Sequence, residues 1–234
     1  MNKTKKIILI LLFIVSISSS VFAASGFEFI LNVPLGVDIG MDVRNKIKNN
    51  EKYEALKPSA FLDAGATLQF GYMLQVANNV GLSLLAETGY SYTSFPYLDP
   101  NNSKAGITFV YDTVQVGVLP KINIGNTSIG IGAGVKLPLA GTQIEYNSTG
   151  TESKHKLSYE DIKNGSISSV IPYVKLTFDY SIFLADLHAL NIGAYVGYNF
   201  GLSPKADEYF EYHYLDSISV GIQLGYRFGP KVSM

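Results

Sequence analysis

From residue 27 onward, the chain alternates between apolar and polar side chains. Between Phe27 and Val43, apolar residues occupy every second position, and the intervening positions include Glu28, Asn32 and Asp38. A period of two predicts a β-strand with two unlike faces, because successive side chains of a strand point to opposite sides. The pattern recurs seven more times. The eight predicted strands cover 27–43, 60–74, 80–92, 107–122, 128–139, 170–182, 190–200 and 218–228.

The connections between these segments alternate between short and long. The short ones lie around 78–79, 123–126 and 183–188, and the long ones cover 44–59, 93–106, 140–169 and 201–217. Short turns at one end and long loops at the other are typical of barrels in bacterial outer membranes. Each segment also reaches the roughly 9–11 residues that a tilted strand needs to cross a bilayer. The predicted fold class is therefore all-β: an eight-stranded antiparallel up-and-down transmembrane β-barrel with short periplasmic turns and long extracellular loops.

Two stretches depart from the regular pattern. In the fourth segment the apolar positions change parity between Tyr111 and Val114, which predicts a β-bulge there. Residues 142–169 of the third long connection are mostly polar. We expect this loop to be the most mobile of the four.

The apolar face of the predicted barrel should point outward. A soluble barrel also alternates, with its apolar face inward, but an eight-stranded barrel has room inside for few large side chains. The opposite face is rich in small residues, such as Gly130, Gly132 and Gly134, and has few of the charges that a soluble surface requires. Aromatic residues also gather at both ends of the segments, for example Tyr72 and Tyr92, as in the two girdles of a membrane barrel.

The amino terminus has the pattern of a secretory signal peptide. Three lysines within the first six residues precede the apolar run 7–17, and a small-residue cleavage pattern ends at Ala23. The run is too short for a comfortable transmembrane helix, although a retained anchor is the alternative. We expect a signal peptide over 1–23 and one barrel domain over 24–234.

Composition excludes several kinds of function. The chain has no cysteine, so it has neither disulfides nor thiolate chemistry. Its formal net charge is −1, which gives no general electrostatic case for binding nucleic acid. No cofactor or metal ligand set stands out.

The final segment, Ile218-Ser-Val-Gly-Ile-Gln-Leu-Gly-Tyr-Arg-Phe228, is similar to the last strand of the small outer-membrane barrels of the OmpA, OmpX and OmpW type. The whole mature chain resembles this superfamily in architecture. One departure is that residues 229–234 follow the last aromatic, whereas family members usually end on it. The resemblance implies an outer-membrane location, contact with outer-membrane lipid and insertion by the barrel-assembly machinery. It does not imply one function, because these barrels include anchors, adhesins, narrow pores and lipid-modifying enzymes.

Inward-facing charges fall into layers along the predicted lumen. Glu28 and Arg227 lie near the bottom on the first and last strands, which must pair to close the barrel, so we expect an ion pair between them. Near mid-height, Glu87 faces Lys136 and Lys175, and a buried charge needs a partner. We expect Glu87 to bridge one of these two lysines. The network then forms either a structural plug or the gate of a narrow, anion-preferring pore.

Near the mouth, Asp38 and Asp63 lie on adjacent strands. Two like charges at this place indicate solvated mouth residues, with a weak cation site as the alternative.

The long loops differ in charge. The first is basic and includes Arg44, whereas the fourth is acidic and includes Asp216, so these neighbouring loops should attract each other, although exposed pairs are individually weak. The fourth loop also contains a run of aromatic residues. These residues either form a contact patch or, as we prefer, extend the last two strands: Tyr209, Phe210, Tyr212 and Tyr214.

Catalysis lacks its usual residues. The three histidines, His155, His188 and His213, lie in predicted turns or loops, and none sits on a predicted strand beside a serine. We therefore expect no catalytic residue. The preferred function is a structural or surface-interaction barrel whose loops meet an extracellular or host partner of unknown identity. A narrow pore for small solutes is the alternative, and a lipid-modifying enzyme ranks third.

Overall fold

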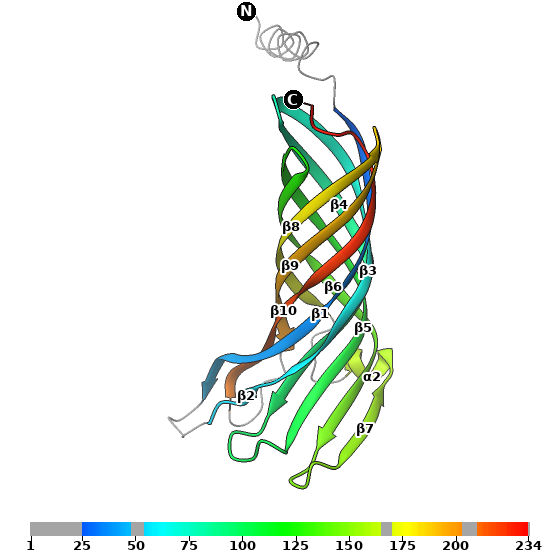
Figure 1. The fold of residues 1–234 in the computed structure, drawn as a ribbon. Coiled ribbons are helices and arrows are strands. Elements are labelled where there is room, and N and C mark those ends of the chain that lie inside the picture. Colours follow the sequence, from blue (N-terminus) through cyan, green and yellow to red (C-terminus); the bar gives the residue numbers. More distant parts are fainter. Residues whose placement is uncertain (1–24, 48–53, 165–169, 203–209, 234) are drawn as a thin grey trace, which may run out of the picture.

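The computed structural model describes residues 25–47, 54–164, 170–202 and 210–233, and eight long strands wind into one closed ring (Figure 1). The ring consists of β1 (Gly26–Ile47), β3 (Ala60–Ala77), β4 (Val80–Leu98), β5 (Gly106–Ile124), β6 (Thr127–Tyr146), β8 (Ile171–Ala185), β9 (His188–Leu202) and β10 (Phe210–Phe228). Each strand pairs antiparallel with the next, and β10 pairs with β1 to close the ring. The predicted eight-stranded antiparallel barrel is confirmed.

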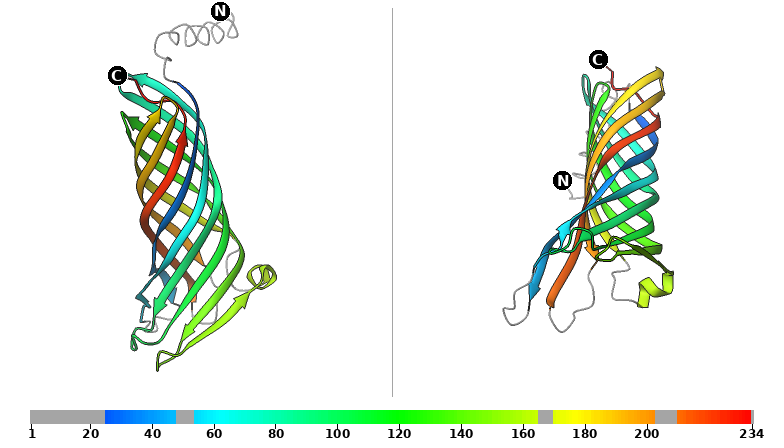
Figure 2. Two further views of the ribbon diagram at one scale, coloured as in Figure 1. Left: turned by 45° about the vertical axis from the view of Figure 1, so that its right-hand side comes forward. Right: turned by 60° about the horizontal axis from the view of Figure 1, so that its bottom comes forward.

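Both ends of the barrel domain lie at the same end of the ring as the three short turns (Figures 1 and 2). We call this the terminal end and the opposite one the loop end. Heights along the lumen are counted from the terminal end, so its lowest layer is the one nearest the top of Figure 1. The predicted signal peptide, 1–23, lies outside the described residues.

Most strands continue past their predicted limits at the loop end. The predicted strand 80–92 extends to Leu98 as β4, 128–139 extends to Tyr146 as β6, and 218–228 begins at Phe210 as β10. Backbone pairing does not require the side chains to alternate. The strands therefore go on where the apolar–polar pattern that revealed them has stopped.

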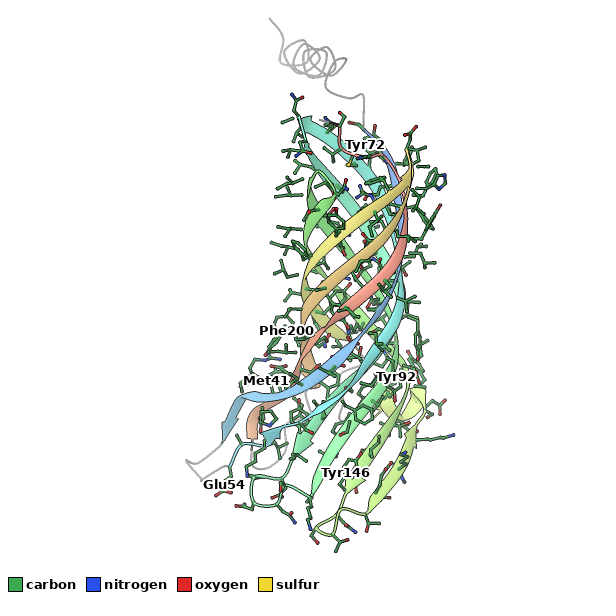
Figure 3. All side chains as sticks on the ribbon, viewed as in Figure 1. Met41, Glu54, Tyr72, Tyr92, Tyr146 and Phe200 are labelled. Atoms are coloured by element: carbon green, nitrogen blue, oxygen red, sulfur yellow. The ribbon has the colours of Figure 1, made fainter. Side chains whose placement is uncertain are left out.

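The two faces of the barrel are arranged as predicted. On β10, outward-facing Ile222 and Leu224 are 56% and 55% exposed, whereas inward-facing Gln223 between them is 2% exposed. Aromatic residues mark both ends of the apolar outer face: Figure 3 shows Tyr72 near the terminal end and Tyr92 toward the loop end. The barrel is thus apolar outside and polar inside.

The predicted bulge is misplaced. β5 pairs with β4 without a break, and Tyr111 is fully buried on the inward face, so parity does not change along β5. The register shift falls instead between β5 and β6, where Asp112 pairs with Ala140 and Thr113 with Pro138. The extra residue is therefore Leu139 on β6. The prediction failed because it treated an inward tyrosine as part of the outward apolar face.

The third long connection contains regular structure that the sequence did not predict. After β6, a short strand, β7 (Glu152–Leu157), pairs with the loop-end part of β6, and a helix, α2 (Tyr159–Asn164), follows. The remaining element, β2 (Lys57–Pro58), pairs with the end of β4. β7 has no apolar–polar alternation, so the sequence pattern does not predict this strand. In the part of the chain that the structure describes, no helix is long and apolar enough to cross a membrane.

A capping box begins α2, and its sequence signal was available. The Ser158 hydroxyl donates to the Asp161 carboxylate at 2.6 Å, the Ser158 N–H donates to it at 2.8 Å, and the Asp161 N–H donates back to the hydroxyl at 3.3 Å. A serine followed three residues later by an acidic residue is a known helix-start pattern.

This cap predicts a pH dependence of α2. The hydrogen bonds from the Ser158 side chain and backbone lower the pKa of Asp161. The stabilisation of the helix start is then complete above the ordinary aspartate pKa and is lost as pH falls through the lower folded value. An NMR titration should give Asp161 a midpoint below that of an unfolded aspartate, and Ser158→Ala should return it toward that value. An unshifted midpoint in the wild-type chain would contradict the prediction.

Candidate functional site: a charged lumen beneath an apolar mouth

The lowest layer of the lumen contains two buried ion pairs. Arg227 of β10 and Glu28 of β1 lie with Nε and Oε1 2.9 Å apart, so the structure brings the two predicted closure residues together. The other Glu28 oxygen accepts a hydrogen bond from the Ser83 hydroxyl at 2.5 Å. Nearby, Lys121 of β5 bridges Asp179 of β8 across 2.9 Å. Each charge has a counter-charge, and further hydrogen bonds reach both pairs, such as those from Gln223 to Asp179 at 2.5 Å and from Arg227 to the Ser181 hydroxyl at 3.2 Å.

Glu87 is the centre of the middle layer. Of its two candidate partners, Lys175 is the one in contact: its ammonium group donates to both carboxylate oxygens, at 2.6 and 2.5 Å. Three neutral donors complete the shell of this carboxylate: Gln69 at 2.8 Å, Gln115 at 3.0 Å and Tyr173 at 3.1 Å. These five hydrogen bonds come from four side chains and link β4 to β3, β5 and β8 across the lumen.

Lys136, the second candidate, has different neighbours. Its ammonium group donates to the Thr93 hydroxyl at 2.8 Å and lies 5.8 Å from the centre of the Tyr173 ring. A cavity of about 50 Å³ adjoins it, lined also by Lys175, Gln115 and Asn199. A cavity of this size admits water.

Asp38 and Asp63 are not the solvated mouth residues that we expected. They are 0% and 5% exposed. Asp38 accepts hydrogen bonds from the Ser94 N–H at 2.6 Å and the Ser219 hydroxyl at 2.5 Å, and Asp63 accepts one from the Tyr195 hydroxyl at 2.5 Å. The expectation failed because the strands continue well above these residues and enclose them.

An apolar cluster lies between the strands on the loop-end side of this level. We call it the mouth cluster, and every member is at most 6% exposed: Phe95 and Tyr97 of β4, Tyr111 of β5, Ile162 of α2, Ile171 of β8 and Leu215 of β10. The Tyr97 hydroxyl donates to the backbone oxygen of Asp216 on β10 at 2.5 Å. β4 and β10 are separated by two strands in the ring, so this tyrosine reaches across the opening. The cluster was not predicted, because residues 93–106 were expected to form a loop, although inward apolar residues continue at Phe95 and Tyr97.

Asp216 joins the strands around the mouth. Its carboxylate accepts two hydrogen bonds from the Arg44 guanidinium, at 2.5 and 2.6 Å, and one each from the Tyr198 hydroxyl and the Gly201 N–H, both at 2.6 Å. Together with the bond from Tyr97 to its backbone, these contacts connect β1, β4, β9 and β10. Arg44 and Asp216 belong to the basic and acidic loops of the sequence, and this pair links the bases of those loops.

The four aromatic residues of the fourth loop lie mostly in β10. Tyr209 is outside the described residues. Phe210, Tyr212 and Tyr214 belong to the strand, as the preferred interpretation expected, although the side chains of the first two are not described. The Tyr214 ring lies 4.2 Å from the Arg44 guanidinium and therefore packs on the Asp216 contacts.

Comparisons with known proteins add a distant likeness in fold. No family model matches the chain, and no curated protein matches it. Among solved structures, Ail, the attachment invasion locus protein of Yersinia pestis, is 13% identical with a TM-score of 0.40, and the match covers 86% of this chain and 98% of that one. Neisserial surface protein A is 9% identical (TM-score 0.36; 87% and 99% covered), and the outer membrane protein OprG of Pseudomonas aeruginosa is 17% identical (0.32; 88% and 97%). At these scores the barrel assignment rests on the closed ring of paired strands.

The histidines occupy strands, contrary to expectation. His155 lies on β7, two residues after Ser153, and both side chains are exposed. His188 begins β9, where its ring nitrogen contacts the Tyr226 hydroxyl, and His213 lies in β10 with its side chain not described. Among the described side chains, no hydrogen bond joins a histidine to a serine. Among the residues that the structure describes, no three or more His, Cys, Asp or Glu side chains form a group that could hold a metal ion.

Proposed function

We propose that this chain is an outer-membrane β-barrel that anchors and displays an extracellular β-structure, and that its lumen does not conduct. The observation that carries the proposal is the filling of the lumen. Buried ion pairs occupy its lower and middle layers, and the mouth cluster covers them. A solute that crossed the barrel would have to break the Glu87–Lys175 pair and displace packed aromatic rings. The function is then left to the surface at the loop end.

The lengths of the strands support display outside a membrane. β4, β5 and β6 have 19, 19 and 20 residues, about twice the roughly 9–11 that cross a bilayer. The excess lies at the loop end, where β2, β4, β5, β6 and β7 pair in succession. In this proposal the apolar outer face contacts outer-membrane lipid, the terminal end faces the periplasm, and the barrel-assembly machinery inserts the chain. An extracellular partner would meet the projecting sheet, whose outermost strand, β7, exposes nearly all its side chains.

The orientation can be tested with single cysteines, because the chain has none of its own. Ser153→Cys places a thiol on β7, and Asn78→Cys places one in the β3–β4 turn. A membrane-impermeant maleimide added to intact cells should label the cysteine at 153 at once and the one at 78 after the outer membrane is permeabilised. The reverse order of labelling would contradict the proposed orientation.

A narrow pore is the second candidate, favoured by the cavity between Lys136 and Lys175. Purified protein in planar bilayers should show no steady current. Glu87→Gln weakens the central contact and is the variant in which a latent pore would appear. Discrete channel currents from most wild-type insertions would overturn the closed-barrel proposal. Currents that appear in the variant would show instead that this network is a gate.

A further inference from the structure

Residues 229–233, which follow the last strand, fold back across the terminal end of the barrel. The Gly229 N–H donates to the Leu187 carbonyl in the β8–β9 turn at 2.9 Å, and the Asn79 N–H in the β3–β4 turn donates to the Ser233 carbonyl at 2.8 Å. The β3–β4 turn lies on the far side of β1 from β10. The segment, which we call the tail, therefore crosses the seam where the ring closes, and Figure 2 shows the carboxyl end lying against this end of the barrel.

Inside the opening, the tail alternates like a strand. Pro230 and Val232 are buried and Lys231 and Ser233 are exposed. Val232 is 2% exposed, and it occupies space that Gly81 leaves free: a Cβ at Gly81 would lie 3.2 Å from the Val232 Cγ2 atom. An apolar side chain thus packs inward at the bottom of the lumen.

The end of the tail has a dedicated partner in Gln75. The Ser233 N–H donates to the Gln75 side-chain oxygen at 3.1 Å, and the Gln75 amide donates to the Ser233 carbonyl at 3.1 Å and hydroxyl at 2.9 Å. Gln75 is 5% exposed. This reciprocal pairing satisfies a buried amide that would otherwise have to find water.

The tail also contacts the lowest charged layer. The Arg227 guanidinium, which pairs with Glu28, donates to the Pro230 carbonyl at 3.3 Å and lies 3.7 Å from the Met73 sulfur. Met73 pairs with Ser83 across β3 and β4, and the Ser83 hydroxyl donates to Glu28. Val232 and Met73 both lie next to Gly81, and Ser83, the strand partner of Met73, contacts Glu28, so the tail lies close to the lowest ion pair.

We propose that residues 229–233 are a built-in floor that closes the periplasmic end of the lumen and keeps water from the Glu28–Arg227 pair. Exclusion of water strengthens this ion pair, because the attraction between charges grows as the local dielectric falls. The floor spans the β10–β1–β3 seam, so it also holds the ring closed. It goes beyond the display function, since a floor is needed whatever the loop end binds.

A single cysteine at position 83 reports on the floor. In Ser83→Cys protein refolded in lipid vesicles, a charged maleimide should react about tenfold or more slowly than with Asn78→Cys, because the thiol becomes accessible through local opening of the tail. Stopping the chain after Phe228 should bring the rate at position 83 close to that of the exposed control. Lys231→Ala, a change at an exposed tail position, should leave the slow rate unchanged.

A second variant guards against misfolding of the truncated chain. Val232→Ser keeps the backbone of the tail and removes its apolar contact, so it should accelerate labelling at position 83 in a barrel whose far-UV circular dichroism is unchanged. Equal labelling rates with and without the intact tail would overturn the proposal. This outcome is separate from the display function, because labelling at position 153 on cells and the absence of current do not depend on the tail.

Discussion

Replacing Asp216 with alanine should destabilise the barrel by about 3 kcal/mol, because it leaves the Arg44 guanidinium, the Tyr198 hydroxyl and the Gly201 N–H without their common acceptor. The Asp216 side chain is fully buried, whereas that of Arg44 is 36% exposed and regains some water. For this reason we expect the lower part of the range known for broken buried pairs. Denaturant unfolding in lipid vesicles, followed by far-UV circular dichroism, measures the change.

A matched control exists on β7. Glu152 pairs with Lys154 at 2.5 Å, but their side chains are 39% and 61% exposed. Glu152→Ala should therefore change the free energy of unfolding by less than about 1 kcal/mol. Hydrogen exchange should also distinguish the two variants, because loss of Asp216 frees the mouth cluster and should speed exchange at the loop ends of β4, β9 and β10. If Asp216→Ala were as stable as Glu152→Ala, the contacts that link four strands at the mouth would make no measurable contribution to the free energy of unfolding.

Removing Glu87 should have an effect at least as large. Glu87→Leu leaves the Lys175 ammonium buried without a counter-charge and the three neutral donors without their shared acceptor, and breaking a buried pair in this way costs about 3–5 kcal/mol. The double variant Glu87→Leu/Lys175→Met should recover a large part of this loss, because it leaves no unpaired charge. The same unfolding measurement applied to both single variants and the double variant gives the coupling free energy.

Lys136→Met is the control for the middle layer. Lys136 contacts the Thr93 hydroxyl and, among the described residues, forms no ion pair within 4.0 Å. It should therefore show little coupling to Glu87, well below the value for Lys175. A coupling to Lys136 equal to that of Lys175 would mean that the two lysines share Glu87, as a gate with alternative pairings requires.

Most of the fold could be predicted from the sequence, because each strand of a membrane barrel repeats one simple pattern of side chains. Each strand must present apolar residues to lipid and small or polar residues to a narrow lumen, so alternation, glycine content and connection lengths all indicate the same architecture. The errors occurred where that requirement ends. On the loop-end side of the apolar band the strands pair through their backbones, and their side chains need not alternate. The apolar–polar pattern therefore does not reveal β7, the extension of β4 or the inward position of Tyr111.

The candidate site was only partly predictable for a related reason. Parity and position along the strands placed Glu28 and Arg227 on adjacent strands at one height, so a short contact between them could be expected. Glu87, Lys136 and Lys175 could be assigned to one height, but the choice of partner depends on stagger around the ring. A difference of a few ångströms decides whether an ammonium group reaches a carboxylate or a neighbouring hydroxyl.

The amino-acid sequence by itself determined that this chain makes eight barrel strands with an apolar outer face and a charged lumen, because those properties follow from local alternation. Tertiary structure alone decided which residues meet across the two ends of the lumen. Tyr97 meets Asp216 across the mouth, and Val232 meets Gly81 at the opposite end. The partners in these contacts are more than a hundred residues apart, and no local pattern relates them. They meet because the ring brings non-neighbouring strands within reach of one side chain.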